Sequence, residues 1–376
     1  MKKSINPVCF YPIVWLTVLL LFQLRYSYVL LEMNNKTLVY LLLSCLFFTL
    51  PAAVSWSKKK YYLNVFTFRK LYNTQGIAVF WALFVLFSIA VFGMFPFFIF
   101  FGVNVARYTE WGFSGFHGLL NAILMSYAII KFGLYLITKE NSHLKIALLC
   151  LLWPMLLLTR QMIMSLFVQF IFVYYYIKGI KARVFFKLGV FFVLIIIAFG
   201  LLGNLRDSGG EEMFYSLAAP TENYPRFLPS GFLWLYIYVT SPINNIVYNI
   251  DNYPLLQFSI GDAFSGLLPS PLRALLPERD NDFVLVNEAL NVASSHVNFL
   301  EGFGFFGSLF YQLILGFIIT MFYIRYKMSD DIKYSFIMAV LAHNIVFSFF
   351  VDFFTNLVFL FQIVFIYLFF SRVRIK

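Results

Sequence analysis

Long apolar segments recur along the chain, separated by short polar or basic stretches. A helix that crosses a bilayer needs about 20 mainly apolar residues, within a range of about 17–25. The segments predicted to span on this basis are 8–24, 37–56, 77–101, 116–137, 145–158, 162–177, 188–203, 303–324, 334–350 and 353–370. Thr159, Arg160 and Gln161 interrupt one apolar stretch and predict a helical hairpin there. The pattern indicates an all-α polytopic integral membrane protein with about ten or eleven transmembrane helices.

Segment 231–250 is apolar enough to cross, but the distribution of basic residues argues against it. If it crossed, the basic clusters at 325–327 and 372–376 would lie opposite the other basic loops. Lys and Arg concentrate on the cytoplasmic side of membrane proteins, so the non-crossing arrangement is favoured. Pro242, Asn244 and Asn245 would be costly in lipid but suit a water-accessible cavity. We therefore expect an interfacial or re-entrant helix, with an eleventh span as the alternative.

This topology divides the chain into three parts. Residues 1–203 form an N-terminal bundle of about seven spans, 204–302 a long external loop, and 303–376 a C-terminal bundle of about three spans. The loop holds eight of the 13 prolines and eleven of the 17 acidic residues, but no lysine. The first span continues without a small-residue cleavage site, which indicates a retained helix rather than a signal peptide. Both termini are expected in the cytoplasm.

Composition agrees with a membrane protein. Hydrophobic residues make up 61% of the chain and charged residues 12%, whereas a soluble domain is roughly a quarter charged. The net charge of +11 comes from basic residues beside the spans, where they set orientation and contact lipid head groups. A nucleic-acid partner is therefore not expected. The three cysteines lie in apolar segments without metal-ligand spacing, so disulfides and metal sites are not expected either.

Arginines, rather than lysines, predominate among the basic residues predicted to lie outside. The planar guanidinium binds phosphate oxygens in a bidentate manner, so an anionic partner is indicated there. Arg160 interrupts the apolar stretch 144–177, where a charge is expensive and points to function. The alternative is an arginine that caps a tight turn and reaches the head groups. Arg206 follows the next outward span, or pairs with Asp207, and Arg273 lies in a proline-flanked segment of the loop.

His296 and Glu301 precede a span on its outer side. An imidazole at such a position can take a proton from a hydroxyl group near neutral pH, and a carboxylate can assist it. Five residues separate them, about 140° apart on one helix, so a direct pair would require a helix start between them. The alternative is an interfacial histidine bonded to loop backbone. No zinc motif, phosphate-binding loop or acidic metal motif occurs, which favours chemistry without a metal or another cofactor.

These features together resemble the bacterial O-antigen and capsule repeat-unit polymerases (Wzy-type), within the wider polymerase and O-antigen ligase group. Arg160 begins the helix after an outward one, and Arg206 follows the seventh span. The segment 238–246, YVTSPINNI, is similar to one common in oligosaccharide repeat-unit polymerases. The segment 296–307, HVNFLEGFGFFG, resembles the histidine-containing start of a late span in polymerases and ligases.

The resemblance implies glycosyl transfer on the outer side of the bacterial cytoplasmic (inner) membrane. The donor would be a glycan on undecaprenyl pyrophosphate, and the acceptor one lipid-linked repeat unit. Arg160, Arg206 and Arg273 would bind pyrophosphate, with His296 as general base and Glu301 as its supporter or substitute. The residues expected to contact sugar are Tyr238, Asn244 and Asn245. A chain-length regulator and a flippase would be partners.

Three alternatives stay open on the sequence. An O-antigen ligase would use the same chemistry but transfer the glycan to lipid A core. Another lipid-sugar transferase or a membrane acyltransferase is less favoured, because its usual early acidic or histidine motifs are missing. A lipid-linked oligosaccharide flippase or transporter would be expected to show two homologous halves, and the sequence shows neither these nor charged residues spread through many spans.

Overall fold

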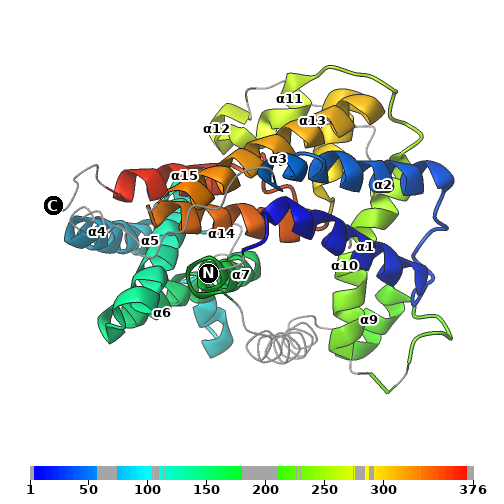
Figure 1. Ribbon diagram of the computed structural model, residues 1–376. Coiled ribbons are helices and arrows are strands. Elements are labelled where there is room, and N and C mark those ends of the chain that lie inside the picture. The colour runs from blue at the N-terminus through cyan, green and yellow to red at the C-terminus, as the bar shows by residue number, and fades with distance from the viewer. Residues whose placement is uncertain are drawn as a thin grey trace.

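Helices form nearly all regular structure in the described part of the chain (Figure 1). The computed structural model describes residues 4–56, 74–103, 105, 110–113, 115–179, 210–225, 227–228, 230–273, 275, 284–287, 292–329 and 331–370. The predicted span 188–203 and Arg206 lie outside these residues. Ser27 and Pro220 form an isolated antiparallel β-bridge.

Four described helical segments are long and apolar enough to cross a membrane, namely Asn35–Ser55, Phe116–Thr138, Arg160–Lys178 and Ser295–Met328. The apolar helices are α1 (Phe10–Gln23), α2 (Asn35–Thr49), α3 (Ala52–Trp56), α4 (Thr74–Phe92), α5 (Phe116–Thr138), α6 (Asn141–Leu156), α7 (Arg160–Lys178), α13 (Ser295–Met328), α14 (Lys333–Val346) and α15 (Leu357–Phe369). The described chain is thus an all-α membrane protein, as the hydropathy pattern predicts.

Local sequence explains where several helices begin and end. The predicted hairpin at Thr159–Gln161 is confirmed: α6 ends at Leu156, Leu158 has a φ of 56°, and α7 begins at Arg160. The predicted span 77–101 is too long, because α4 ends at Phe92, before Gly93 with a φ of 76°. A short 3₁₀ helix follows from Pro96 to Phe101. Proline suits a helix start but cannot continue one, so the two helices remain separate.

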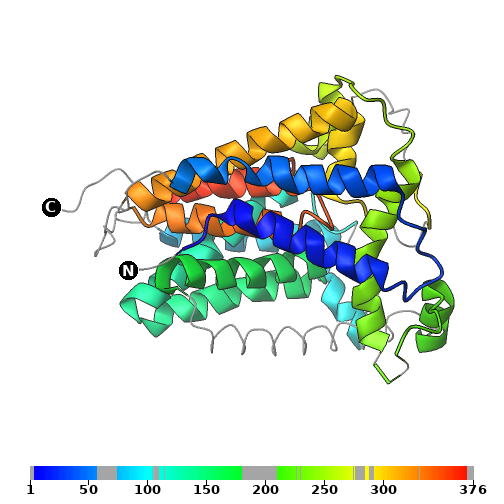
Figure 2. The same cartoon turned by 45° about the vertical axis from the view of Figure 1, so that its right-hand side comes forward.

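The described N-terminal and C-terminal residues lie at the same end of the bundle (Figure 2). The Tyr323 hydroxyl near the end of α13 donates to the Ser4 carbonyl at 2.6 Å. The Lys333 Nζ at the start of α14 lies 5.1 Å from the centre of the Tyr367 ring near the end of α15. We call this the basic end. Its described charged side chains are Lys139, Glu140, Lys145, Lys178, Arg325, Lys327, Asp331 and Lys333.

Four helices that precede α13 gather at the opposite end of the bundle (Figures 1 and 2). They are α9 (Gly210–Ala218), α10 (Ser230–Asn249), α11 (Ile260–Phe264) and α12 (Ser270–Arg273), with a 3₁₀ helix (Ser265–Leu267) between the last two. We call them the cap, and this the cap end. In both views α10 lies across the end of α1 and the other long helices instead of running along them. The described charged side chains at this end are Arg25, Glu32, Lys36, Glu110, Arg160, Glu212, Glu222, Asp251, Asp262, Arg273, Glu301 and Asp352.

Helix α13 reverses its direction at Gly304. An unbroken helix would place residues 296 and 312 about 24 Å apart, yet Gln312 Nε2 lies 2.9 Å from His296 Nδ1. Gly304 has a φ of 68° and a ψ of −170°, a non-helical conformation. Residues 295–303 therefore form a half-helix that runs through the bundle toward the cap end, and residues 305–328 return. The predicted span 303–324 corresponds to the returning part, and the predicted boundary at residue 302 falls inside α13.

The segment Pro254–Ser259 stabilises this reversal with backbone hydrogen bonds. The amides of Gln257 and Ser259 donate to the carbonyls of Phe303 and Gly302, at 3.1 and 2.7 Å. The Phe305 amide donates to the Pro254 carbonyl at 2.9 Å. Backbone groups freed by a helix break within a membrane protein must find partners inside the protein, because lipid offers none. The segment 254–259, which lies between α10 and α11 and which we call the cap segment, supplies these hydrogen-bond partners.

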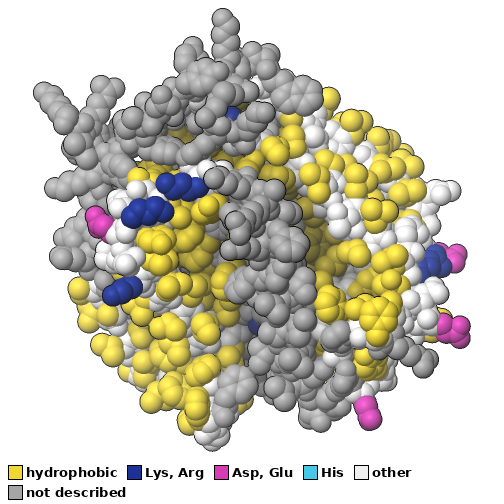
Figure 3. Space-filling model, turned by 60° about the horizontal axis from the view of Figure 1, so that its bottom comes forward, with side chains coloured by type: hydrophobic (Ala, Val, Ile, Leu, Met, Phe, Trp, Pro, Cys, Tyr) yellow, Lys and Arg dark blue, Asp and Glu magenta, His cyan; other side chains and the backbone are white. Residues whose placement is uncertain are grey.

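Hydrophobic side chains cover much of the surface between the two ends (Figure 3). In that view basic side chains gather toward the left, and acidic ones gather toward the right. Large side chains at 50% exposure or more include Leu20 on α1, Leu46 on α2 and Phe310 on α13. A soluble protein rarely exposes so extensive an apolar surface, whereas a bilayer covers it at no such penalty. This apolar surface between the two ends is consistent with a membrane protein whose polar ends face water.

A pair of glutamines joins two helices inside the bundle. Gln169 Nε2 on α7 donates to Gln362 Oε1 on α15 at 3.0 Å, and Gln362 Nε2 donates to Gln169 Oε1 at 2.7 Å. Both side chains are fully buried. Each side-chain amide thereby provides a hydrogen-bond donor and an acceptor for the other. A lone glutamine in an apolar core would lack these partners.

Candidate functional site

His296 is fully buried in the half-helix of α13, where α1 and α2 pack against it. Its Nε2 lies 3.2 Å from the Tyr11 hydroxyl on α1, and its Nδ1 lies 3.1 Å from the Tyr40 hydroxyl on α2. The Trp15 ring packs on the imidazole edge to face, with 4.4 Å between ring centres. The sequence places His296 at the mouth of a span, but the reversal of α13 puts it inside the bundle.

One arrangement of donors and acceptors around this imidazole forms a closed ring of hydrogen bonds. Ser44 donates to Gln312 Oε1, so the amide nitrogen of Gln312 faces His296 Nδ1 as a donor at 2.9 Å. His296 Nδ1 is then an acceptor, and Nε2 carries the proton that it donates to Tyr11. The Tyr11 hydroxyl donates to Ser44 at 3.0 Å and closes a ring of four hydrogen bonds. The ring requires a neutral imidazole, because a second proton on Nδ1 would meet the Gln312 N–H.

Two further groups complete this buried polar cluster. The Tyr40 hydroxyl lies 3.0 Å from Ser308 Oγ and 3.1 Å from His296 Nδ1, and Ser308 donates to the Phe305 carbonyl at 2.8 Å. Tyr40 and Ser44 are four residues apart on α2, as are Ser308 and Gln312 on α13. Polar residues at that spacing share one helix face, and two such faces in apolar spans were the sequence signal that could have identified the cluster.

Glu301 belongs to the same half-helix as His296. Because residues 295–303 are continuous helix, the helix start that a direct pair requires does not lie between them. Glu301 is half-buried and engaged in an interaction of its own. The two residues therefore share a helix without sharing a face, and their predicted catalytic roles stay predictions.

Asp352 anchors the half-helix to the turn between α14 and α15. Asn298 Nδ2 on the half-helix donates to Asp352 Oδ2 at 3.0 Å, and the amides of Phe354 and Thr355 donate to Oδ1 at 2.9 and 3.3 Å. Burial raises the pKa of Asp352, and the hydrogen bonds from Thr355 and Asn298 oppose that shift. The turn also separates the two helices more widely than the predicted spans 334–350 and 353–370 do.

The predicted pyrophosphate-binding arginines have different surroundings. Arg160 is the first residue of α7, at the cap end, half-buried and engaged in an interaction. Arg273 is exposed, and its Nε and Nη2 donate to the carbonyls of Ser265 and Leu268 at 3.1 and 3.2 Å. Both residues are on the cap side, Arg273 within the cap itself.

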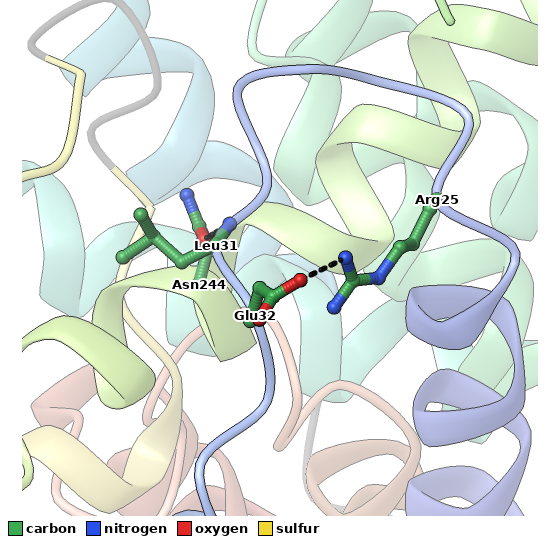
Figure 4. Close-up of polar contacts among 4 residues, drawn as sticks. All are labelled: Arg25, Leu31, Glu32 and Asn244. Atoms are coloured by element: carbon green, nitrogen blue, oxygen red, sulfur yellow. Dashed lines mark hydrogen bonds and ion pairs between the residues drawn. The ribbon is translucent and has the colours of Figure 1, made fainter. Parts of the chain in front are cut away.

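The predicted sugar-contacting asparagines hold backbone. Asn244 Oδ1 accepts from the Leu31 amide at 2.7 Å (Figure 4), and Asn244 Nδ2 donates to the Val29 carbonyl at 3.0 Å. Asn245 Nδ2 donates to the Val292 carbonyl at 2.9 Å, and both asparagines are buried. They fix the segments that cover α10, as buried amides with complete partners do.

Tyr238 on α10 lies in a row of aromatic rings. Its ring stacks on Trp234 at 5.6 Å between centres and lies 5.9 Å from Phe350. Trp234 in turn stacks on Phe214 of α9 at 3.8 Å. Tyr238 keeps 37% of its surface exposed, so its ring is accessible at the cap end.

Across the described residues, no cluster of three or more His, Cys, Asp or Glu side chains could hold a metal ion. Comparison with models of known protein families gives no match, and no curated protein and no solved structure proves detectably similar to the chain.

Proposed function

We propose that the chain is a membrane glycosyltransferase that polymerises undecaprenyl-pyrophosphate-linked oligosaccharide repeat units into O-antigen or capsular polysaccharide. The resemblance of segments 238–246 and 296–307 to repeat-unit polymerases motivates the proposal. The observation that carries it is the cap end, where α7 begins at Arg160 and where acidic side chains such as Glu222 and Asp251 are exposed. Such an end offers hydroxyl-binding groups for sugars beside a cation for a lipid pyrophosphate.

The charge distribution supports an external cap. Basic side chains predominate at the opposite end, together with the described N- and C-terminal residues. The positive-inside rule assigns that end to the cytoplasm. The cap would then face outward from the cytoplasmic membrane. Residues 1–203 would form the N-terminal bundle, residues 204–302 the external loop that contains the cap, and residues 303–376 the C-terminal bundle.

The proposed chemistry needs a charge-neutralised leaving group and an activated hydroxyl. Arg160 and Arg206, with Arg273 assisting, would bind the pyrophosphate of the donor and stabilise the charge that develops on it. His296, or Glu301 in its place, would accept the proton of the acceptor hydroxyl. In the described arrangement both nitrogens of His296 are engaged, so its action as a base requires the ring of hydrogen bonds to open.

Transport is the second candidate, because one observation favours it. Broken helices such as α13 occur at the binding sites of secondary transporters. In this chain, however, the cap segment 254–259 occupies the break, and a closed, fully buried set of hydrogen bonds surrounds His296. A substrate path through the break would have to displace both, so transferase is the better-supported function.

The test is complementation of a strain that lacks its own polymerase, read as a polysaccharide ladder on a gel. We expect the wild-type chain to restore the ladder and Arg160→Ala to reduce polymerisation by about 100-fold, because one electrostatic donor is lost. Lys145→Ala is the matched control, since Lys145 is an exposed cation at the basic end. An intact ladder in Arg160→Ala would show that Arg160 is not part of the pyrophosphate site. A wild-type chain that gives no ladder at matched membrane expression would overturn the polymerase proposal.

A further inference from the structure

A pair of adjoining cavities opens at the cap end, where the chain after α1 meets the chain after α9. Their volumes are about 300 and 380 Å³. Tyr28, Thr221 and Glu222 line both cavities. The first is also lined by Asn223, and the second by Tyr215. We call the two together the tyrosine hollow.

The walls of the tyrosine hollow are fixed by backbone contacts. The Tyr28 amide donates to the Ala219 carbonyl at 2.8 Å, and the Thr221 amide donates to the Tyr26 carbonyl at 3.0 Å. Asn244 holds the following residues from behind through both atoms of its amide (Figure 4). The hollow is thus formed before any ligand binds, which lowers the entropic penalty of binding.

The exposed side chains in the hollow combine an aromatic face with hydrogen-bonding groups. Tyr28 keeps 71% of its surface exposed, although its backbone is bonded on the inner side. Glu222 and Asn223 are exposed beside it. A carboxylate accepts hydrogen bonds, and an amide both donates and accepts them. A tyrosine ring presents an apolar face with a polar tip.

The charges of the hollow argue against a phosphate ligand. Of the described residues that line it, Arg25 is the cation, and its Nη1 is paired with Glu32 Oε1 at 2.8 Å (Figure 4). Glu222 adds a negative charge to the lining. Glu222 would repel an anion, and among the described lining residues only the ion-paired Arg25 could offset that repulsion. A ligand with hydroxyl groups and apolar C–H faces fits the lining instead.

We infer that the tyrosine hollow binds a saccharide, with one sugar ring stacked on Tyr28 and its hydroxyls bonded to Glu222 and Asn223. This inference rests on the proposed function, since it names a place outside the bundle for the glycan whose pyrophosphate would bind at Arg160. The hollow would hold sugar residues of the glycan at a distance from the reacting bond and so determine how the glycan is aligned. Asn244, predicted as a sugar contact, would position the wall and not touch the sugar.

The experiment measures binding to the full chain in lipid nanodiscs by saturation-transfer NMR. One probe is the soluble oligosaccharide repeat unit released by mild acid from the surface polysaccharide of the encoding organism, and the other is inorganic pyrophosphate. We expect Tyr28→Ala to weaken oligosaccharide binding by about ten-fold, as the loss of a stacked ring does. Tyr28→Phe and the control Tyr248→Ala should keep wild-type affinity, because Tyr248 is exposed on α10 outside the hollow.

Unchanged oligosaccharide affinity in Tyr28→Ala would overturn the inference, as would competition by pyrophosphate for the same signals. Tyr28 is a surface residue, and Tyr28→Phe reports on stacking even if the alanine variant misfolds. Binding and polymerisation are read separately. A wild-type chain that makes a ladder but binds no oligosaccharide refutes the hollow alone, whereas one that binds but makes no ladder refutes the polymerase proposal and leaves the hollow standing.

Discussion

Gly304 is the residue on which the reversal of α13 depends, so Gly304→Ala should destabilise the protein strongly. Its φ of 68° and ψ of −170° lie in a region that is essentially restricted to glycine, at a cost of about 1–3 kcal/mol for another residue. A Cβ atom there would lie 2.6 Å from the Pro254 carbonyl oxygen. Since that oxygen is backbone, the cap segment itself would have to move.

The movement would weaken two hydrogen bonds that close the break. These are the bonds from the Phe305 amide to the Pro254 carbonyl and from the Gln257 amide to the Phe303 carbonyl. Each contributes about 0.5–1.5 kcal/mol. With the backbone strain, the expected loss in the free energy of unfolding is about 2–6 kcal/mol. At about 2 °C per kcal/mol for a large chain, the thermal midpoint should fall by about 4–12 °C.

The assay is the thermal midpoint of the detergent-solubilised chain, followed by size-exclusion chromatography of a fluorescent fusion. Gly261→Ala is the matched control, because Gly261 lies in α11 of the cap with open space around its Cβ position and no unusual φ. Equal midpoints for Gly304→Ala and Gly261→Ala would refute the reasoning. They would mean that α13 runs straight or that the cap segment does not close the break.

Three other perturbations probe the buried polar groups. Tyr11→Phe removes one link of the hydrogen-bonded ring around His296 and should lower stability by about 1–3 kcal/mol, since a buried donor is left without a partner; an unchanged midpoint would argue against the ring. Gln169→Leu should destabilise the protein, while the double replacement of Gln169 and Gln362 by leucine should recover much of the loss, which a double-mutant cycle of thermal midpoints measures. Burial raises the pKa of Asp352, which lies in the turn outside the spans. The folded state therefore favours the protonated carboxyl group. The free energy of unfolding should fall as pH rises from the ordinary carboxyl pKa of about 3.9 through the raised pKa. Asp352→Asn should flatten that slope between pH 4 and 8, and a slope equal to that of the wild type would assign it to another group.

The sequence by itself determined the class of the protein and located the four described helices that are long and apolar enough to cross a membrane. Hydropathy is a local property, and about 20 consecutive apolar residues allow few structures other than a membrane helix. The break at Arg160 was predictable for the same reason, because a charge and a polar pair interrupt one apolar stretch. The end of α4 at Phe92 was missed, although Gly93 and Pro96 mark it, because apolar residues continue on both sides.

Tertiary structure alone decided where the candidate residues lie. His296 follows a polar loop in the sequence, yet it is buried because α13 reverses at Gly304 and residues 254–259 close the break. Asn244 looked available for a ligand, but a loop more than 200 positions earlier in the chain uses its amide. Such contacts join groups that are distant along the chain, and no local pattern of hydrophobic and polar residues records them. The tyrosine hollow has the same origin, since its two walls meet only when the chain after α1 pairs with the chain after α9.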